Sequence, residues 1–143
     1  MKFITISGID KSGKTTIIKE LMDKTFYKHY VVDRDPSNYH SLCILQKRHK
    51  TISQKEEYKT FTKRFSKIVD LAVLLKCNET TLKERFIKTN EPKLVGFCTI
   101  KEHQLLIEQK FDAIGYKNYI KIDTSNKTVS HCVNLIISKL GEL

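Results

Sequence analysis

The sequence predicts a three-layer α/β domain in which helices cover both faces of a parallel sheet of about four to five strands. Short apolar segments typical of buried strands alternate along the chain with amphipathic segments of helical period. A glycine-containing turn also joins the first strand segment to the first helical segment, an order typical of folds that bind a phosphate at a helix N-terminus. The 143 residues are expected to form one domain over 1–143.

The first predicted elements are a strand, a loop and a helix in that order. Apolar side chains dominate residues 2–7, and residues 16–22 continue as a helix with apolar positions at 17, 18, 21 and 22. Between them lies Gly8-Ile9-Asp10-Lys11-Ser12-Gly13-Lys14-Thr15, which fits the pattern G-x-x-x-x-G-K-[ST]. This pattern in this context predicts a P-loop NTPase fold.

The chemistry of the loop suits a nucleotide triphosphate. Gly8 and Gly13 allow a tight, partly left-handed backbone, and several loop N–H groups would converge at the positive end of the helix dipole. Lys14 would reach the β- and γ-phosphates, and the Thr15 hydroxyl would ligate Mg²⁺. A turn of similar composition without a ligand is the alternative. The predicted residues for binding ATP are Gly8, Asp10, Lys11, Ser12, Gly13, Lys14, Thr15 and Thr16.

The remaining elements follow from the same periodicities. Residues 33–38 are expected to form a loop because of Pro36 and its polar neighbours. A long helix is expected to begin near Ser53, at a capping pattern, and to bury a stripe that includes Phe61 and Phe65. The other predicted strands are 29–32, 71–75 and 119–123, and the other predicted helices are 41–49, 80–88, 101–114 and 130–140, with a break at 90–93.

Charged residues that directly follow predicted strands are the candidates for catalysis, because ligands of open α/β sheets bind outside the carboxyl ends of the strands. Asp33 could hold a Mg²⁺-bound water or accept a proton, and Arg34 could bridge two phosphates. A charged strand end that bonds its own loop is the alternative. Arg85, with Lys88 and Lys93 near the predicted break, could neutralise charge in phosphoryl transfer. A solvated helix face would look similar.

The charge balance favours anionic partners. Twenty-six Lys and Arg against sixteen Asp and Glu give a net charge of +10, which suits nucleotides or nucleic acid. Lysines at 55, 59, 63 and 67 could follow a nucleic-acid backbone, or could form a solvated helix face. The four scattered cysteines are expected to be free thiols. No apolar run is long enough for a membrane span, and a cytoplasmic location is expected.

Several segments together resemble the thymidylate kinases. The opening Phe3–Thr16 is similar to the start of that family, and Asp33-Arg34 resembles its Asp-Arg-Tyr/His motif. Val69–Leu75 resembles its Pro-Asp-Leu strand, Lys83-Glu84-Arg85 the start of its Arg-bearing lid, and Ile120–Thr124 its C-terminal strand. The resemblance covers most of the chain, with the P-loop as its specific part.

The resemblance implies roles for individual residues. It implies that Lys14 and the loop amides bind the ATP phosphates, that Thr15 binds Mg²⁺, and that Asp33 belongs to the shell of groups around the metal. Asp10 lies where the family contacts the acceptor sugar, and Lys11 where some members carry a catalytic Arg. Arg34 would contact the acceptor phosphate, and Arg85 the transferring phosphoryl. The implied catalytic residues are therefore Lys14, Arg34, Lys11, Arg85 and Asp33.

The chain also departs from the family pattern. Ser7 replaces the usual Glu, Asp35 replaces the aromatic residue after Asp-Arg, and the short spacing between Lys14 and Asp33 omits a strand. Asp33–Pro36 could instead correspond to an earlier Arg-Glu-Pro motif of the family. Such a compact version resembles a viral or phage enzyme, which would act in the host cytoplasm, and the family suggests a homodimer.

The expected activity is transfer of the ATP γ-phosphoryl to a deoxynucleoside monophosphate such as dTMP. A nucleoside, another small alcohol or a polynucleotide 5′-hydroxyl is the alternative acceptor. A nucleotide-binding protein without transferase activity is the third possibility, because part of the family's acceptor region is missing.

Overall fold

A computed structural model describes residues 1–9, 12–45, 52–89 and 100–143 of the chain. The strands are β1 (Phe3–Gly8), β2 (Tyr30–Asp33), β3 (Leu71–Lys76) and β4 (Tyr119–Asp123). The helices are α1 (Lys14–Lys24), α2 (Pro36–Leu45), α3 (Ile52–Ile68), α4 (Glu79–Thr89), α5 (Ile100–Ile114) and α6 (Val129–Gly141). The four strands form one sheet in the order β2-β1-β3-β4, and every pair is parallel.

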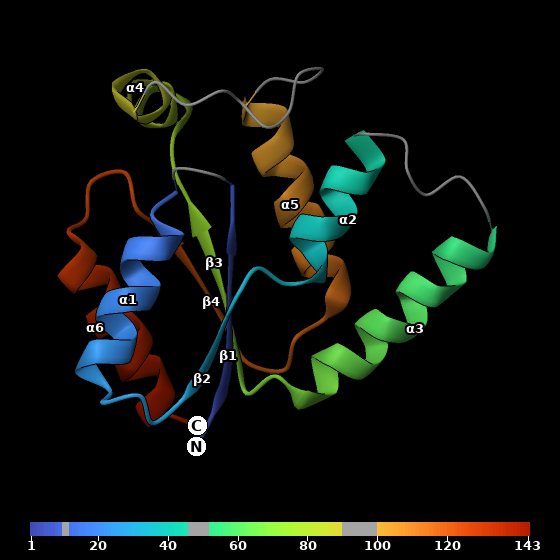
Figure 1. Ribbon diagram of the computed structural model, residues 1–143, viewed down its shortest axis with the longest axis horizontal. Coiled ribbons are helices and arrows are strands. Elements are labelled where there is room, and N and C mark those ends of the chain that lie inside the picture. The colour runs from blue at the N-terminus through green and yellow to red at the C-terminus, as the bar shows by residue number, and fades with distance from the viewer. Residues whose placement is uncertain (10–11, 46–51, 90–99) are drawn as a thin grey trace.

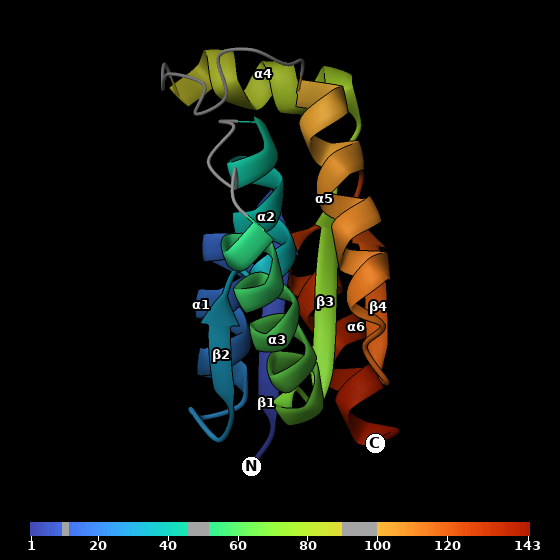
Figure 2. The same ribbon diagram turned by 90° about the vertical axis from the view of Figure 1, so that its right-hand side faces the viewer.

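Helices cover both faces of this sheet. Helices α1 and α6 pack on one face, and α2, α3 and α5 lie on the other (Figure 1). Helix α4 lies across the carboxyl end of the strands (Figure 2). This arrangement confirms the predicted three-layer α/β fold with a parallel sheet.

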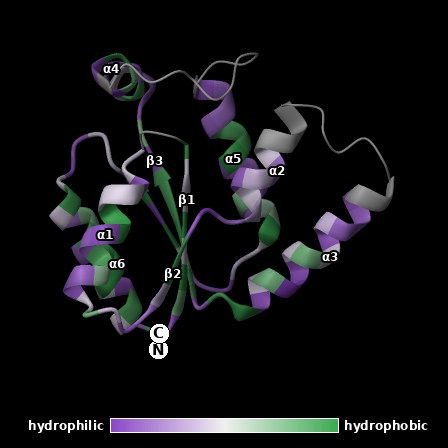
Figure 3. Cartoon of the chain, viewed as in Figure 1, coloured by the Kyte–Doolittle hydropathy of each residue, from purple (hydrophilic) through white to green (hydrophobic). Residues whose placement is uncertain are grey.

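The two faces of β1 enter two different cores. Ile4 and Ile6 belong to an apolar cluster with Ile17 and Leu21 of α1 and residues of α6. Phe3 on the other face, and Ile9 directly after the strand, instead pack with the cluster on the α5 side. Hydrophobic residues accordingly concentrate on the central strands, whereas α3 alternates in character along its length (Figure 3). Strand β3 is apolar on both faces, with Leu71, Val73 and Leu75 in the first cluster and Ala72 and Leu74 in the second, as a central position in a parallel sheet requires.

One predicted loop is partly helical. Residues 33–38 were expected to be a loop, but α2 already begins at Pro36. The carboxylate of Asp35 accepts hydrogen bonds from the N–H groups of Ser37 at 2.9 Å and of Asn38 at 3.4 Å, and from the Ser37 hydroxyl. Asp35 therefore caps the helix, and proline is well suited to the first helical position. The polar residues interpreted as a loop signal were a helix start.

The other predicted elements agree with the structure within a few residues. The helix predicted from Ser53 is α3, but the buried stripe predicted for it is wrong at Phe61, whose side chain is 56% exposed, whereas Phe65 packs against the core on the α5 side. The helix predicted over 41–49 begins within α2, and its residues 46–49 lie outside the described residues. The strand predicted over 71–75 is β3, and the one over 119–123 is β4. The predicted break at 90–93 falls outside the residues that the structure describes.

Candidate functional site

The loop between β1 and α1 has the backbone geometry that its glycines permit. Gly8 has φ 154° and Gly13 has φ 101°, both in a region that side chains rarely adopt. A Cβ on Gly8 would lie 2.7 Å from the carbonyl oxygen of Leu75 and 2.7 Å from the Ser12 hydroxyl. No side chain caps the N-terminus of α1 at Gly13. Gly13 thus supplies no side-chain acceptor to the first N–H groups of α1, an arrangement compatible with anion binding at this helix end.

Lys14 folds back over this loop. Its side chain is buried, and Nζ donates to the carbonyl oxygens of Gly8 at 2.7 Å and Ile9 at 3.0 Å. Ser12 N donates to the same Ile9 oxygen at 3.1 Å. The ammonium group therefore lies within the loop, bonded to oxygens of its own backbone.

The residue that follows β4 contacts both the loop and helix α4. Thr124 Oγ1 lies 2.8 Å from Ser12 O and 3.2 Å from Lys76 O. Arg85 of α4 donates from one guanidinium nitrogen to Thr124 O at 3.2 Å, and its other nitrogen lies 3.5 Å from Thr124 Oγ1. Thr124 thus contacts both Arg85 of α4 and Ser12 of the loop between β1 and α1.

Asn38 contacts the loop from the opposite side. Gly8 N donates to Asn38 Oδ1 at 3.1 Å, and Asn38 Nδ2 donates to Gly8 O at 2.8 Å. The sequence patterns did not single out Asn38 as a site residue. A polar residue shortly after the strand that neighbours β1 was the available signal, but the loop interpretation of 33–38 hid it.

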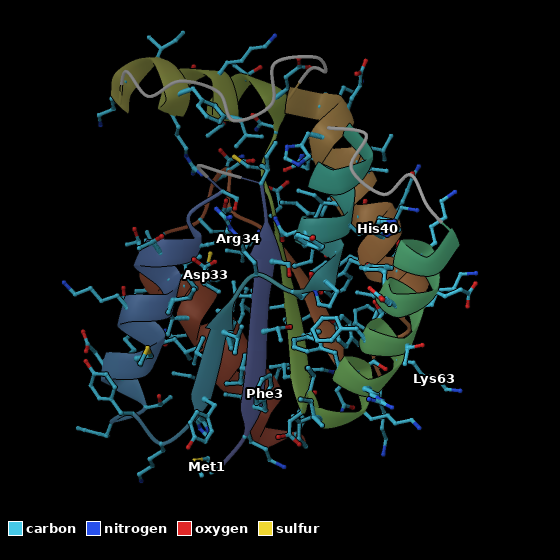
Figure 4. The ribbon with its side chains drawn as sticks, turned by 45° about the vertical axis from the view of Figure 1, so that its right-hand side comes forward. Met1, Phe3, Asp33, Arg34, His40 and Lys63 are labelled. Carbon is cyan, nitrogen blue, oxygen red and sulfur yellow. The ribbon has the colours of Figure 1, made fainter. Side chains whose placement is uncertain are left out.

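Asp33 and Arg34 lie at the expected edge of the sheet. Asp33 ends β2 opposite Ile6 of β1, and Arg34 N donates to Ile6 O at 2.8 Å. Arg34 has φ 74°, so the chain turns away from the sheet there. Both residues are exposed, at the same end of the sheet as the first turn of α1 (Figure 4).

Asp35, by contrast, points into the protein. Its second carboxylate oxygen accepts a 2.6 Å hydrogen bond from the Tyr116 hydroxyl, in the segment between α5 and β4. Burial, and then the charge and the hydrogen bond of Asp35, raise the pKa of Tyr116. The residue that departs from the thymidylate kinase pattern is thus a buried helix cap, placed to fix the start of α2.

The remaining predicted residues are distributed as follows. Thr15 and Thr16 are exposed in the first turn of α1, and Lys88 is exposed on α4, whereas Asp10, Lys11 and Lys93 lie outside the described residues. Within the described ranges, no group of three or more His, Cys, Asp and Glu side chains could hold a metal ion. Mg²⁺ in kinase sites needs few protein ligands, because phosphates and waters complete its shell. Thr15 and Asp33 stay the candidates.

The predicted lysine row lies apart from this site. Lys55, Lys59, Lys63 and Lys67 are all exposed on α3. Helix α3 lies on the α5 side of the sheet, and Lys63 points outward from it (Figure 4). None of the helices among the described residues combines the length and the apolarity needed to cross a membrane.

Comparison with known proteins gives matches in structure and not in sequence. No protein-family model matches the sequence, and no curated protein matches it significantly. Deoxyadenosine kinase from M. mycoides, with the products dCMP and dCDP, matches with a TM-score of 0.67 and 15% identity over 99% of this chain and 100% of that chain. The same kinase with bound dATP matches with a TM-score of 0.63 and 16% identity over 97% and 99%.

A further match is the YorR protein from Bacillus subtilis, in complex with phosphorylated GDP. Its TM-score is 0.69, with 15% identity over 97% of this chain and 95% of that chain. At such identities the likeness establishes the fold alone, a parallel α/β fold that this chain shares with these proteins over nearly its whole length. The narrower resemblance to thymidylate kinases stays a prediction.

Proposed function

We propose that the protein is an ATP-dependent kinase whose acceptor is a deoxynucleoside monophosphate, with dTMP as the first candidate. The observation that carries this proposal is the loop itself: Gly8 and Gly13 in glycine-type conformations, Lys14 within the loop, and a helix N-terminus without a side-chain cap. The full-length likeness to deoxyadenosine kinase supports a phosphotransferase of the nucleoside and nucleotide class.

In this proposal the loop between β1 and α1 binds ATP, the phosphoryl donor. The N–H groups at the start of α1 and the ammonium of Lys14 bind the triphosphate, with the helix dipole adding to the attraction. Thr15 and Asp33 would hold Mg²⁺, which would neutralise negative charge on the phosphates. Lys14 has to exchange the carbonyls of Gly8 and Ile9 for phosphate oxygens, a move that a flexible four-carbon side chain permits.

The two arginines would serve the acceptor and the transferred group. Arg34 follows β2 at the same sheet edge as the loop, so its guanidinium suits the acceptor phosphate. Arg85 lies beside Thr124 next to the loop, where it would neutralise charge that develops on the transferring phosphoryl. Asp10 and Lys11 keep the roles that the family resemblance implies.

A deoxynucleoside is the second candidate acceptor. The observation that favours it is the likeness to a deoxyadenosine kinase over the whole of both chains. A nucleoside hydroxyl requires a base to accept its proton, whereas a monophosphate requires a cation for its charge. Exposed Asp33 and Arg34 at the end of β2 would supply one or the other. The exposed lysines of α3 would suit a polynucleotide acceptor. A homodimer, which the family resemblance suggests, stays a prediction.

The test is a panel of acceptors. ADP release from ATP and Mg²⁺ is measured with each deoxynucleoside, each deoxynucleoside monophosphate and a 5′-hydroxyl oligonucleotide. We expect turnover with one monophosphate above all other acceptors. Preference for a deoxynucleoside would establish the second candidate instead. MgATP binding without transfer to any member of the panel would exclude kinase function and favour a nucleotide-binding protein.

A further inference from the structure

Asn38 and Gly8 form a two-point contact at the origin of the phosphate loop. The side-chain carbonyl of Asn38 accepts from Gly8 N at 3.1 Å, and its amide nitrogen donates to Gly8 O at 2.8 Å. Gly8 N must donate and Gly8 O must accept, so the backbone itself fixes the orientation of the Asn38 amide. Only a side chain with both a donor and an acceptor can make this pair.

The Asn38 contact takes the place of a strand-to-strand hydrogen-bond partner for Gly8. Ile6 O, two residues before Gly8 on β1, accepts from Arg34 N of the neighbouring chain segment at 2.8 Å. The chain then leaves the sheet because Arg34 turns with φ 74°. Gly8 therefore has no β2 residue beside it, since the register of the two strands ends at Ile6 and Asp33. The Asn38 amide occupies the place where the next backbone partner would have been.

Asn38 lies in a helix start that is itself hydrogen-bonded to a buried residue. It lies in the first turn of α2, which Asp35 caps through the N–H groups of Ser37 and Asn38. Asp35 is 5% exposed and also accepts a 2.6 Å hydrogen bond from Tyr116. A buried, charged acceptor with several donors holds its neighbours firmly. The start of α2 is thus fixed relative to α5 and β4.

Among the described residues, two side chains donate a hydrogen bond to Gly8 O, and the proposed function affects them differently. Lys14 Nζ donates to it at 2.7 Å and Asn38 Nδ2 at 2.8 Å. On the proposed function, Lys14 leaves this oxygen when a triphosphate binds. A buried carbonyl oxygen without a hydrogen-bond donor would destabilise the nucleotide-bound state. Asn38 remains beside Gly8 O in that state.

We infer that Asn38 is a positioning residue for nucleotide binding, which keeps Gly8 O hydrogen-bonded after Lys14 has moved to the phosphates. This inference rests on the proposed function for the movement of Lys14. It adds a specific consequence: loss of Asn38 disfavours the nucleotide-bound loop more than the free loop, because in the free loop Lys14 still donates to Gly8 O.

The test compares three variants by MgATP affinity, measured by titration calorimetry well below the melting temperature. Asn38→Ala removes both hydrogen bonds, and we expect its affinity to fall about tenfold. Asn38→Asp keeps the shape and the acceptor for Gly8 N but loses the donor, and its charge also attracts Lys14. We expect its affinity to fall at least as far.

Asn118→Ala is the matched control. Asn118 Nδ2 donates to a backbone oxygen, that of Asp70, at 3.2 Å. The two residues directly precede β4 and β3, so they lie at the amino ends of the parallel strands, away from the loop that follows β1. A purely structural asparagine of this kind should change the melting temperature and leave the MgATP affinity within about twofold. Equal MgATP affinity in wild type and both Asn38 variants would overturn the inference, whatever their melting temperatures.

Amide exchange separates this inference from the proposed function. The Gly8 N–H should exchange faster in Asn38→Ala than in wild type without any nucleotide, because its acceptor is gone; unchanged exchange would overturn the contact itself. Wild type that binds MgATP but transfers no phosphoryl overturns only the kinase proposal, and the affinities still decide the role of Asn38. Wild type that binds no MgATP overturns both.

Discussion

Thr124 Oγ1 lies 2.8 Å from Ser12 O, so a residue just after the last strand contacts the loop between β1 and α1 across 112 positions of sequence. The same threonine accepts from Arg85 through its backbone oxygen at 3.2 Å. Thr124 is therefore the residue through which α4 and the loop are held next to each other. Its hydroxyl carries the loop contact and its backbone carries most of the Arg85 contact.

Thr124→Val tests the hydroxyl alone, because valine has nearly the same shape. The Ser12 carbonyl loses a donor, and we expect kcat/KM to fall about tenfold while Arg85 keeps its backbone acceptor. Thr124→Ser retains the hydroxyl and should stay within about twofold of wild type. Steady-state kinetics on the acceptor found by the panel measures both, and a Ser variant as slow as the Val variant would show that the methyl group matters instead.

Lys14→Ala should abolish most of the activity. The ammonium is the one charged side chain of the loop that the structure describes, and removal of such an electrostatic contact costs about 10²- to 10³-fold in kcat/KM. The melting temperature should change little by comparison, since the hydrogen bonds that Lys14 makes to Gly8 O and Ile9 O are within the loop itself.

Lys19→Ala is the control for charge and helix position, because Lys19 is exposed on the same helix. It should leave kcat/KM unchanged. Loss of activity in the Lys19 variant equal to that of Lys14→Ala would mean that general positive charge, and not the loop lysine, supports catalysis.

Gly8→Ala should destabilise the fold and not only the site. The added Cβ would lie 2.7 Å from the backbone oxygen of Leu75, and φ 154° is unfavourable for alanine. We expect the free energy of unfolding to fall by about 1–3 kcal/mol in urea denaturation. Gly141→Ala is the control, because a Cβ there would meet nothing within 4 Å. Equal stability of the two variants would contradict the close approach of β1 and β3 at Gly8.

His29 should make the stability depend on pH. Its Nδ1 accepts a hydrogen bond from Lys2 N at 3.1 Å. Burial lowers the pKa of His29 in the folded protein, and the positive N-terminus, Lys2 and Lys28 lower it further. The unfolded chain, with a pKa near 6.5, therefore binds a proton at a higher pH than the folded protein.

Protonation of His29 should therefore destabilise the folded protein. The free energy of unfolding should be constant with respect to His29 above pH 6.5 and decrease as the pH falls below it. Urea denaturation at a series of pH values measures this, with His29→Ala as the comparison. A variant whose stability declines as steeply as that of wild type over the same range would assign the decline to other groups.

Much of this architecture could be predicted from local patterns. The continuous apolar run of β3 requires burial on both faces, and the glycine spacing of Gly8 and Gly13 requires a turn at the start of a helix. These are properties of neighbouring residues, so a sequence displays them directly. The start of α2 was misread because proline, aspartate and serine serve loops and helix N-termini equally well. The hydrogen bond from Tyr116 to the capping carboxylate of Asp35 comes from 81 positions away, so local patterns could not display it.

The amino-acid order alone thus determined the alternation of strands and helices, the glycine loop between β1 and α1, and the edge of the sheet where charged residues gather. It did so because periodicity and glycine spacing act over a few residues. The tertiary structure alone decided that Asn38 pairs with Gly8, that Thr124 contacts Ser12, and that Arg85 lies beside them. These contacts join segments far apart in the chain, and their geometry exists only once the sheet has fixed the relative positions of its strands and helices.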